Sequence, residues 1–267
     1  MNITDFFHYE FILRALITGS FIALICSILG VLLVLRRFSL IGDGLAHVTF
    51  GSVALGLLLR QHPLYVSIPV VMASSLGILK LTEKAKLYGD AAIGIVSSLG
   101  IAGGVLIASV AGGFNVDLFS YLFGNILSIS KTEVFTSIAL SIIVLSIIFI
   151  FYNEYFSTTF DEEFAKVSGI NTKKLNSILV LLTGITVVLT MKVVGIMLTS
   201  SLLILPAVTA LQIAKGFKNT MVFSSLVAIS SVIAGIYISF ITNLPTGATI
   251  VMVNFIIFIT AFFYKNL

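Results

Sequence analysis

The sequence predicts an all-α integral membrane protein, a polytopic bundle of about eight to nine transmembrane helices. Apolar residues make up 58% of the 267 residues and charged residues only 10%, whereas about 25% of the residues of a soluble domain are charged. The mean hydropathy is +1.17, and apolar runs close to the ~20 residues that span a bilayer alternate with short polar breaks. We therefore expect residues 1–267 to form a single transmembrane domain, with no soluble domain.

Nine apolar runs are candidate spans, because each approaches the length that crosses the hydrocarbon core as a helix. They cover residues 11–35, 41–59, 64–80, 91–111, 132–152, 175–197, 199–214, 220–241 and 247–264. The stretch 114–130 is short and amphipathic, which predicts a re-entrant or surface helix. If one of the nine runs were itself re-entrant, eight complete crossings would remain.

The basic residues predict how the chain is oriented. Alternate loops hold 11 of the 15 basic residues, and by the positive-inside rule these loops are cytoplasmic. They carry Arg36, Arg37, Lys80, Lys84, Lys86, Lys166, Lys173, Lys174, Lys215, Lys218 and Lys265. The N-terminus is then outside and the C-terminus inside. Because the basic residues lie at helix ends and form no patch, the net charge of +4 does not predict nucleic-acid binding.

An acid and a histidine lie at the start of the second predicted span. Asp43 and His47 are four residues apart, so on a helix they share one face, one turn apart. Ionisable side chains within a membrane are costly and usually functional, and a carboxylate with an imidazole forms half of a site for a divalent transition metal. Two chains would supply two such pairs around one pathway. The alternative is that Asp43 caps the helix and His47 is a polar packing residue.

The longest charged segment covers residues 153–174. Its acidic run Asp161–Glu163 and its glycine Gly169 predict a short cytoplasmic helix near residues 160–170. That helix is either a solvated connection or a docking point for a soluble partner. The sequence has no Gly-x-x-x-x-Gly-Lys-[Ser/Thr] loop and no hydrolase elbow. We therefore expect no enzyme activity in this chain, and any ATP-driven step on another polypeptide.

The sequence resembles, essentially end to end, the permease subunits of ATP-binding-cassette (ABC) importers for zinc, manganese and iron. The most specific matching segment is Leu35–His47. Other segments match the family only weakly when taken alone, but together and in this order they form a strong match. They are Thr82–Lys84, Ala92–Ile95, Tyr121–Gly124, Thr159–Glu163, Gly195–Leu198, Leu203–Ala207 and Leu244–Gly247.

The resemblance implies a homodimer in the plasma or inner membrane, with cytoplasmic ATP-binding subunits and an extracellular or periplasmic metal-binding protein. Asp43 and His47 fall on the family's aspartate and histidine, which implies that they contact the transported metal; no other bound cofactor is implied. The cytoplasmic helix resembles the ATPase-docking signature, which falls here on Glu163, Ala165 and Gly169. Phe164 departs from the usual second alanine.

The resemblance leads us to expect zinc as the transported metal, with manganese or iron as alternatives. The segment Val48–Gly51 lacks the Ala-Val-Leu-Pro pattern of many manganese-type members, and the Asp161–Glu163 run also favours zinc. Transport would follow an alternating-access cycle. Two other interpretations stay open at this point: a metal transporter driven by an ion gradient, and a membrane anchor or receptor subunit that transports nothing.

Overall fold

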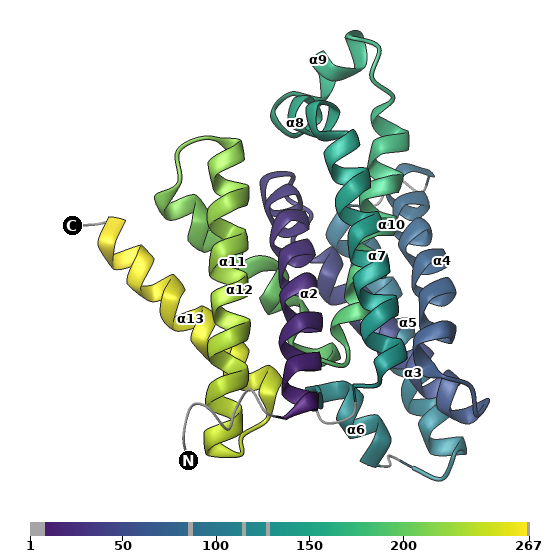
Figure 1. The fold of residues 1–267 in the computed structure, drawn as a ribbon. Helices are drawn as coiled ribbons and strands as arrows, with labels where there is room; N and C mark the ends of the chain where they lie inside the picture. The colour runs from purple at the N-terminus through teal and green to yellow at the C-terminus, as the bar shows by residue number, and fades with distance from the viewer. Residues whose placement is uncertain (1–8, 85–87, 114–115, 127–128, 266–267) are drawn as a thin grey trace. The chain divides into compact units, whose positions relative to one another are not determined.

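The computed structural model describes residues 9–84, 88–113, 116–126 and 129–265. Over these residues the chain is helical and contains no strand. It divides into two compact units (Figure 1). We call residues 32–114 and 142–188 the α3–α5 unit, and residues 1–31, 115–141 and 189–267 the α11–α13 unit.

Nine helices of the described chain are long and apolar enough to cross a membrane. The prediction of an all-α bundle with eight to nine spans is therefore confirmed. The expectation of one transmembrane domain stays a prediction. The nine helices are α2 (Glu10–Leu35), α3 (Ile41–Leu58), α4 (Pro63–Lys84), α5 (Gly89–Val110), α7 (Lys131–Ile150), α10 (Thr172–Thr190), α11 (Thr199–Ile213, preceded by the 3-10 turn η2, Ile196–Leu198), α12 (Phe217–Thr242) and α13 (Thr246–Lys265).

The sixth predicted span, residues 175–197, is shorter than the sequence indicates, because α10 ends at Thr190. The backbone N–H groups of Val193, Val194 and Gly195 all turn back to the Thr190 carbonyl, at 3.0–3.3 Å. Gly195 then adopts a φ of 93°, which ends the helical path. The apolar pattern runs through this turn, so hydropathy alone did not reveal it.

In the stretch 114–130 the structure describes the short α-helix α6 (Val116–Phe123). Eight residues of helix extend only about 12 Å, which is too short to cross a bilayer. The prediction of a short helix that does not span the membrane agrees with this length. Within the α11–α13 unit, α6 packs against η2 and α13.

In the α3–α5 unit, α3 packs against both α5 and α4. The Ser52 hydroxyl of α3 donates a hydrogen bond to the Ser67 hydroxyl of α4 at 2.7 Å, and both residues are buried. Two short helices, α8 (Tyr152–Phe160) and α9 (Glu162–Val167), lie beyond the ends of α7 and α10 (Figure 1). They are therefore the parts of this unit that extend furthest from its membrane-length helices.

In the α11–α13 unit, the three helices α11, α12 and α13 pack against one another, and polar pairs join the long helices. Ser27 of α2 bonds Ser225 of α12 at 3.0 Å, and Ser231 of α12 donates to Asn254 of α13 at 2.9 Å. In a membrane such groups are satisfied within the protein, which is why they lie between helices.

Candidate metal-transport site

Asp43 and His47 both lie on α3, in its first two turns. The helix begins at Ile41, and its N-cap residue is Leu40, whose side chain makes no capping bond. Asp43 is thus the third residue of the helix and does not occupy the N-cap position that the capping alternative favoured. A carboxylate in the first turn of a helix is stabilised by the positive end of the helix dipole.

The two side chains point toward each other. Asp43 Oδ2 lies 3.6 Å from His47 Nε2. Two donors on one zinc ion, each about 2.0–2.2 Å from it at a tetrahedral angle, lie about 3.4 Å apart. The observed separation therefore suits two ligands of a single ion, with little movement of either side chain.

The pair combines a partly buried ring with a more accessible carboxylate. The His47 side chain is 22% exposed and the Asp43 side chain 50% exposed. The Nδ1 atom of His47 is buried and has no hydrogen-bond partner in the part of the chain that the structure describes. The carboxylate is therefore the more accessible group of the two.

Close packing of α5 against α3 holds this region in place. A Cβ atom added to Gly100 would lie 2.8 Å from both the His47 carbonyl oxygen and the Val48 Cα. A Cβ added to Gly44 would lie 2.6 Å from Ile93 of α5. The backbones approach so closely because small residues meet on both helices. The sequence showed the small residues of α3, but not that those of α5 lie opposite.

A cavity of about 350 Å³ borders the same helices one residue further along. Val48, Gly51 and Ser52 of α3 line it, together with residues of α4 and α5. Neither Asp43 nor His47 lines this cavity. Across the described ranges no group of three or more His, Cys, Asp or Glu side chains is placed to hold a metal. Within these ranges Asp43 and His47 therefore form a pair and not part of a larger cluster of such side chains.

The predicted docking residues lie in and around α9, which starts with a strong cap. Asp161 is its N-cap, and its carboxylate accepts a hydrogen bond from the Phe164 backbone N–H at 2.8 Å. At the other end, the N–H of Gly169 bonds the Lys166 carbonyl at 3.1 Å and the N–H of Ile170 bonds the Ala165 carbonyl at 3.0 Å. This is a Schellman motif.

The three docking residues have different surroundings. Glu163 is exposed, whereas Ala165 is completely buried. Gly169 has a φ of 86°, a conformation that favours glycine, so it ends the helix. Phe164 and Val167 are 64% and 89% exposed. The surface that α9 offers therefore includes Phe164, Lys166 and Val167 beside Glu163, and not the signature residues alone.

Comparison with known proteins identifies the family. The model of the ABC 3 transport family matches residues 8–265. The chain belongs to this family. It is a multi-pass membrane protein and the permease subunit of an ABC importer for metals.

Relatives of this ABC 3 permease are named for two different metals, manganese and zinc. The manganese transport system membrane protein MntC of Listeria monocytogenes is 34% identical over 96% of this chain and 91% of its own length. The high-affinity zinc uptake system membrane protein ZnuB of Haemophilus influenzae is 32% identical over 97% of this chain and 99% of its own length.

A solved structure of PsaBC from Streptococcus pneumoniae, in complex with Fab, also resembles this ABC 3 permease. It has a TM-score of 0.85 and 30% identity, and the match covers 98% of this chain and 95% of that one. The predicted family is therefore confirmed. The likeness also supports the helical architecture described above over nearly the whole chain.

Three charged side chains of this ABC 3 permease are largely shielded from solvent, which the sequence did not indicate. Lys192 Nζ lies 3.5 Å from Glu133 Oε1 and 4.4 Å from the ring centre of Tyr121. Arg36, which the sequence indicated only as a basic loop residue, has a side chain just 4% exposed. A charge pattern gives the position of such residues along the chain, but their burial depends on helices that are distant in sequence.

Proposed function

We propose that this permease carries a divalent first-row transition metal inward, driven by ATP hydrolysis on cytoplasmic partner subunits. The observation that supports it most directly is the 3.6 Å separation of Asp43 Oδ2 and His47 Nε2 on one face of α3. A carboxylate and an imidazole are ligands that both Zn²⁺ and Mn²⁺ accept. In a membrane-length helix such a pair is costly to maintain without a function.

A second copy of the chain completes the site in this proposal. Zn²⁺ takes about four ligands in most protein sites, and each chain contributes Asp43 and His47. A symmetric dimer supplies four donors around one pathway, since a two-fold axis brings the same residues together twice. The transported ion is then the substrate, held briefly as an extracellular or periplasmic metal-binding protein delivers it.

The ATPase partner docks on α9 in this proposal. The helix carries exposed Phe164 and Val167 beside exposed Glu163, and exposed apolar side chains of this size on a polar turn suit a protein partner. Membership of the ABC 3 family argues against the gradient-driven alternative and against an anchor that transports nothing. The N-terminus lies outside and the C-terminus inside, as the basic loops indicate.

The metal is zinc or manganese. The sequence favours zinc, and relatives of similar identity are named for manganese and for zinc. A single competition experiment separates the two ions. The complex is reconstituted in vesicles with its ATPase and binding protein, and uptake of labelled zinc is measured against increasing manganese, then the reverse.

Alanine substitution tests the ligand pair. Asp43→Ala or His47→Ala is expected to lower ATP-dependent metal uptake at least about tenfold, because even the loss of an outer partner of a ligand costs a metal site about 10- to 100-fold. The matched controls are Asp90→Ala, which removes an acid from the first turn of α5, and His62→Ala, which removes an exposed histidine. Both controls should retain uptake.

Two results would contradict the proposal. Unchanged uptake in both Asp43→Ala and His47→Ala would show that the pair does not handle the metal. Uptake that continues at the full rate with a partner ATPase unable to hydrolyse ATP would show that the import is not ATP-driven.

A further inference from the structure

Arg36 is a buried charge immediately after the end of α2. Its side chain is 4% exposed, and a guanidinium taken out of water loses much hydration energy unless partners replace it. Burial lowers the pKa of Arg36, while the neighbouring Glu162 carboxylate and Tyr155 phenol oppose that shift. An arginine side chain is effectively always protonated in proteins, so Arg36 keeps its charge.

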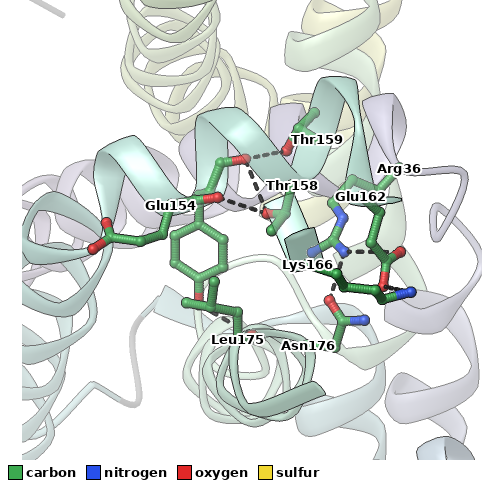
Figure 2. Close-up of polar contacts among 9 residues, drawn as sticks. Arg36, Glu154, Thr158, Thr159, Glu162, Lys166, Leu175 and Asn176 are labelled. Carbon is green, nitrogen blue, oxygen red and sulfur yellow. Dashed lines mark hydrogen bonds and ion pairs between the residues drawn. The ribbon is translucent and has the colours of Figure 1, made fainter. Parts of the chain in front are cut away.

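The partners of Arg36 come from two other helices of the same unit, as Figure 2 shows. The Nη2 atom donates to the side-chain oxygen of Asn176 on α10 at 2.5 Å and lies 3.9 Å from Glu162 Oε2 on α9. Glu162 also pairs with Lys166 at 3.3 Å. One guanidinium therefore contacts both α9 and α10, the helices on either side of the loop of residues 168–171.

The other terminal nitrogen of the guanidinium, Nη1, differs from Nη2 in its contacts. Nη1 is buried and has no hydrogen-bond partner among the residues that the structure describes. Arginine presents five donors in a rigid fork, so this group is only partly satisfied in the present arrangement. If a neighbouring helix moves and brings another acceptor within reach, Nη1 can bond it, because this donor is not already used.

Arg36 is also close along the chain to α3, the helix that carries Asp43 and His47. The Arg36 N–H bonds the Leu32 carbonyl at 3.1 Å and the Phe38 N–H bonds the Leu33 carbonyl at 2.8 Å, so the linker is folded back onto the end of α2. The next helix, α3, begins at Ile41 and carries Asp43 in its first turn. Only residues 37–40 join Arg36 to α3, so a displacement of Arg36 reaches the start of that helix through a short linker.

We propose that Arg36 is a positioning residue that couples α9 to α3, so that movement of the docking helix is transmitted to Asp43 and His47. The inference rests on the proposed function, since it requires an ATPase that acts on α9. In this proposal the Arg36 side chain is the physical connection between α9 and the pair Asp43 and His47. A purely structural ion pair would instead hold the fold together without affecting how ATP hydrolysis is used.

The test is the number of metal ions imported per ATP hydrolysed by the complete reconstituted complex. Arg36→Met removes the charge and leaves an unbranched apolar chain, while the Glu162 left behind is 40% exposed and still pairs with Lys166. We expect ATP hydrolysis to continue while the ions imported per ATP fall by about twofold to thirtyfold, the range found for coupling changes along packed networks. Arg37→Met, at the exposed neighbour, is the matched control and should leave the ratio unchanged.

A second variant keeps the test decisive if Arg36→Met fails to assemble. Asn176→Ala removes the 2.5 Å acceptor and leaves the guanidinium and Glu162 in place. A lower ratio of ions to ATP in this variant supports the link. An unchanged ratio, or uptake and hydrolysis that fall in proportion together with the melting temperature, overturns it. A wild-type complex that imports no metal with ATP would refute the proposed function instead, which separates the two failures.

Discussion

At the residue scale, the position of His47 depends on a glycine in another helix. The His47 carbonyl oxygen and the Val48 Cα lie only 2.8 Å from the position that a Cβ atom would take at Gly100. Because backbone rather than a flexible side chain occupies this space, the contact does not yield easily. Gly103, three residues along α5, has no atom within 4 Å of its Cβ position. Both glycines lie on α5, but their surroundings are opposite.

Gly100→Ala should therefore destabilise the permease. An added methyl group at a tight backbone contact costs about 1–3 kcal/mol, and the shift of α5 displaces His47 and lowers metal uptake. Gly103→Ala should leave stability unchanged or raise it by up to about 1 kcal/mol, because alanine favours helix more than glycine does. Thermal unfolding in detergent and uptake in vesicles measure both effects. Equal behaviour of the two variants would show that α3 and α5 are not in contact at this point.

At the element scale, α9 is a helix of six residues that depends on its ends. Isolated helices of this length do not form in water, so the Asp161 cap, the Schellman motif at Gly169 and packing against α8 must stabilise it. Buried Ala165 fixes the inner face of the helix. The outward direction of Glu163 and Phe164 follows from that anchoring.

Asp161→Ala should loosen α9. Loss of the N-cap acceptor costs about 1 kcal/mol, so hydrogen exchange of the amides of residues 162–167 should become faster and the bound ATPase should decrease on co-purification. Asp161→Asn, which retains an acceptor for the Phe164 N–H, is the control and should resemble the wild type. If both variants exchanged at the wild-type rate, the cap would not stabilise this helix.

At the scale of the whole molecule, one face of the α3–α5 unit is apolar and open. Leu99, Leu106 and Val110 of α5 are 68–81% exposed. In a membrane that face meets either lipid or another protein helix, and both are compatible with its chemistry. A second copy of the chain is the partner that the proposed four-ligand site requires.

Mixed assemblies test this dimer. Wild-type and His47→Ala chains that are expressed in equal amounts and pair at random should give about one quarter of the uptake of the same quantity of wild-type chains, because only the fully wild-type dimers keep four ligands. Separately tagged copies measure the proportion of each assembly. Uptake of about one half would mean that each chain works alone, and the shared site would then be rejected.

The sequence by itself determined that the protein lies in a lipid bilayer and that it is built of helices. Long apolar runs with charges at their ends have one stable solution, helices that satisfy their own backbone hydrogen bonds in lipid, and this is why eight of the nine spans ended within a few residues of their predicted limits. The spacing of Asp43 and His47 already placed them on one helical face. Gly169 and the acids before it likewise indicated a short helix and its end, because capping is a local interaction.

Only the tertiary structure decided which groups are buried and what they contact. The early end of α10 at Thr190, the approach of Gly100 to His47, the burial of Ala165 and the contacts of Arg36 with Glu162 and Asn176 all depend on neighbours far away along the chain or on a turn hidden in apolar sequence. Hydropathy averages over about 20 residues and carries no information on such pairs. Burial sets the cost of a charge, so the role of Arg36 could be inferred only once its neighbours were known.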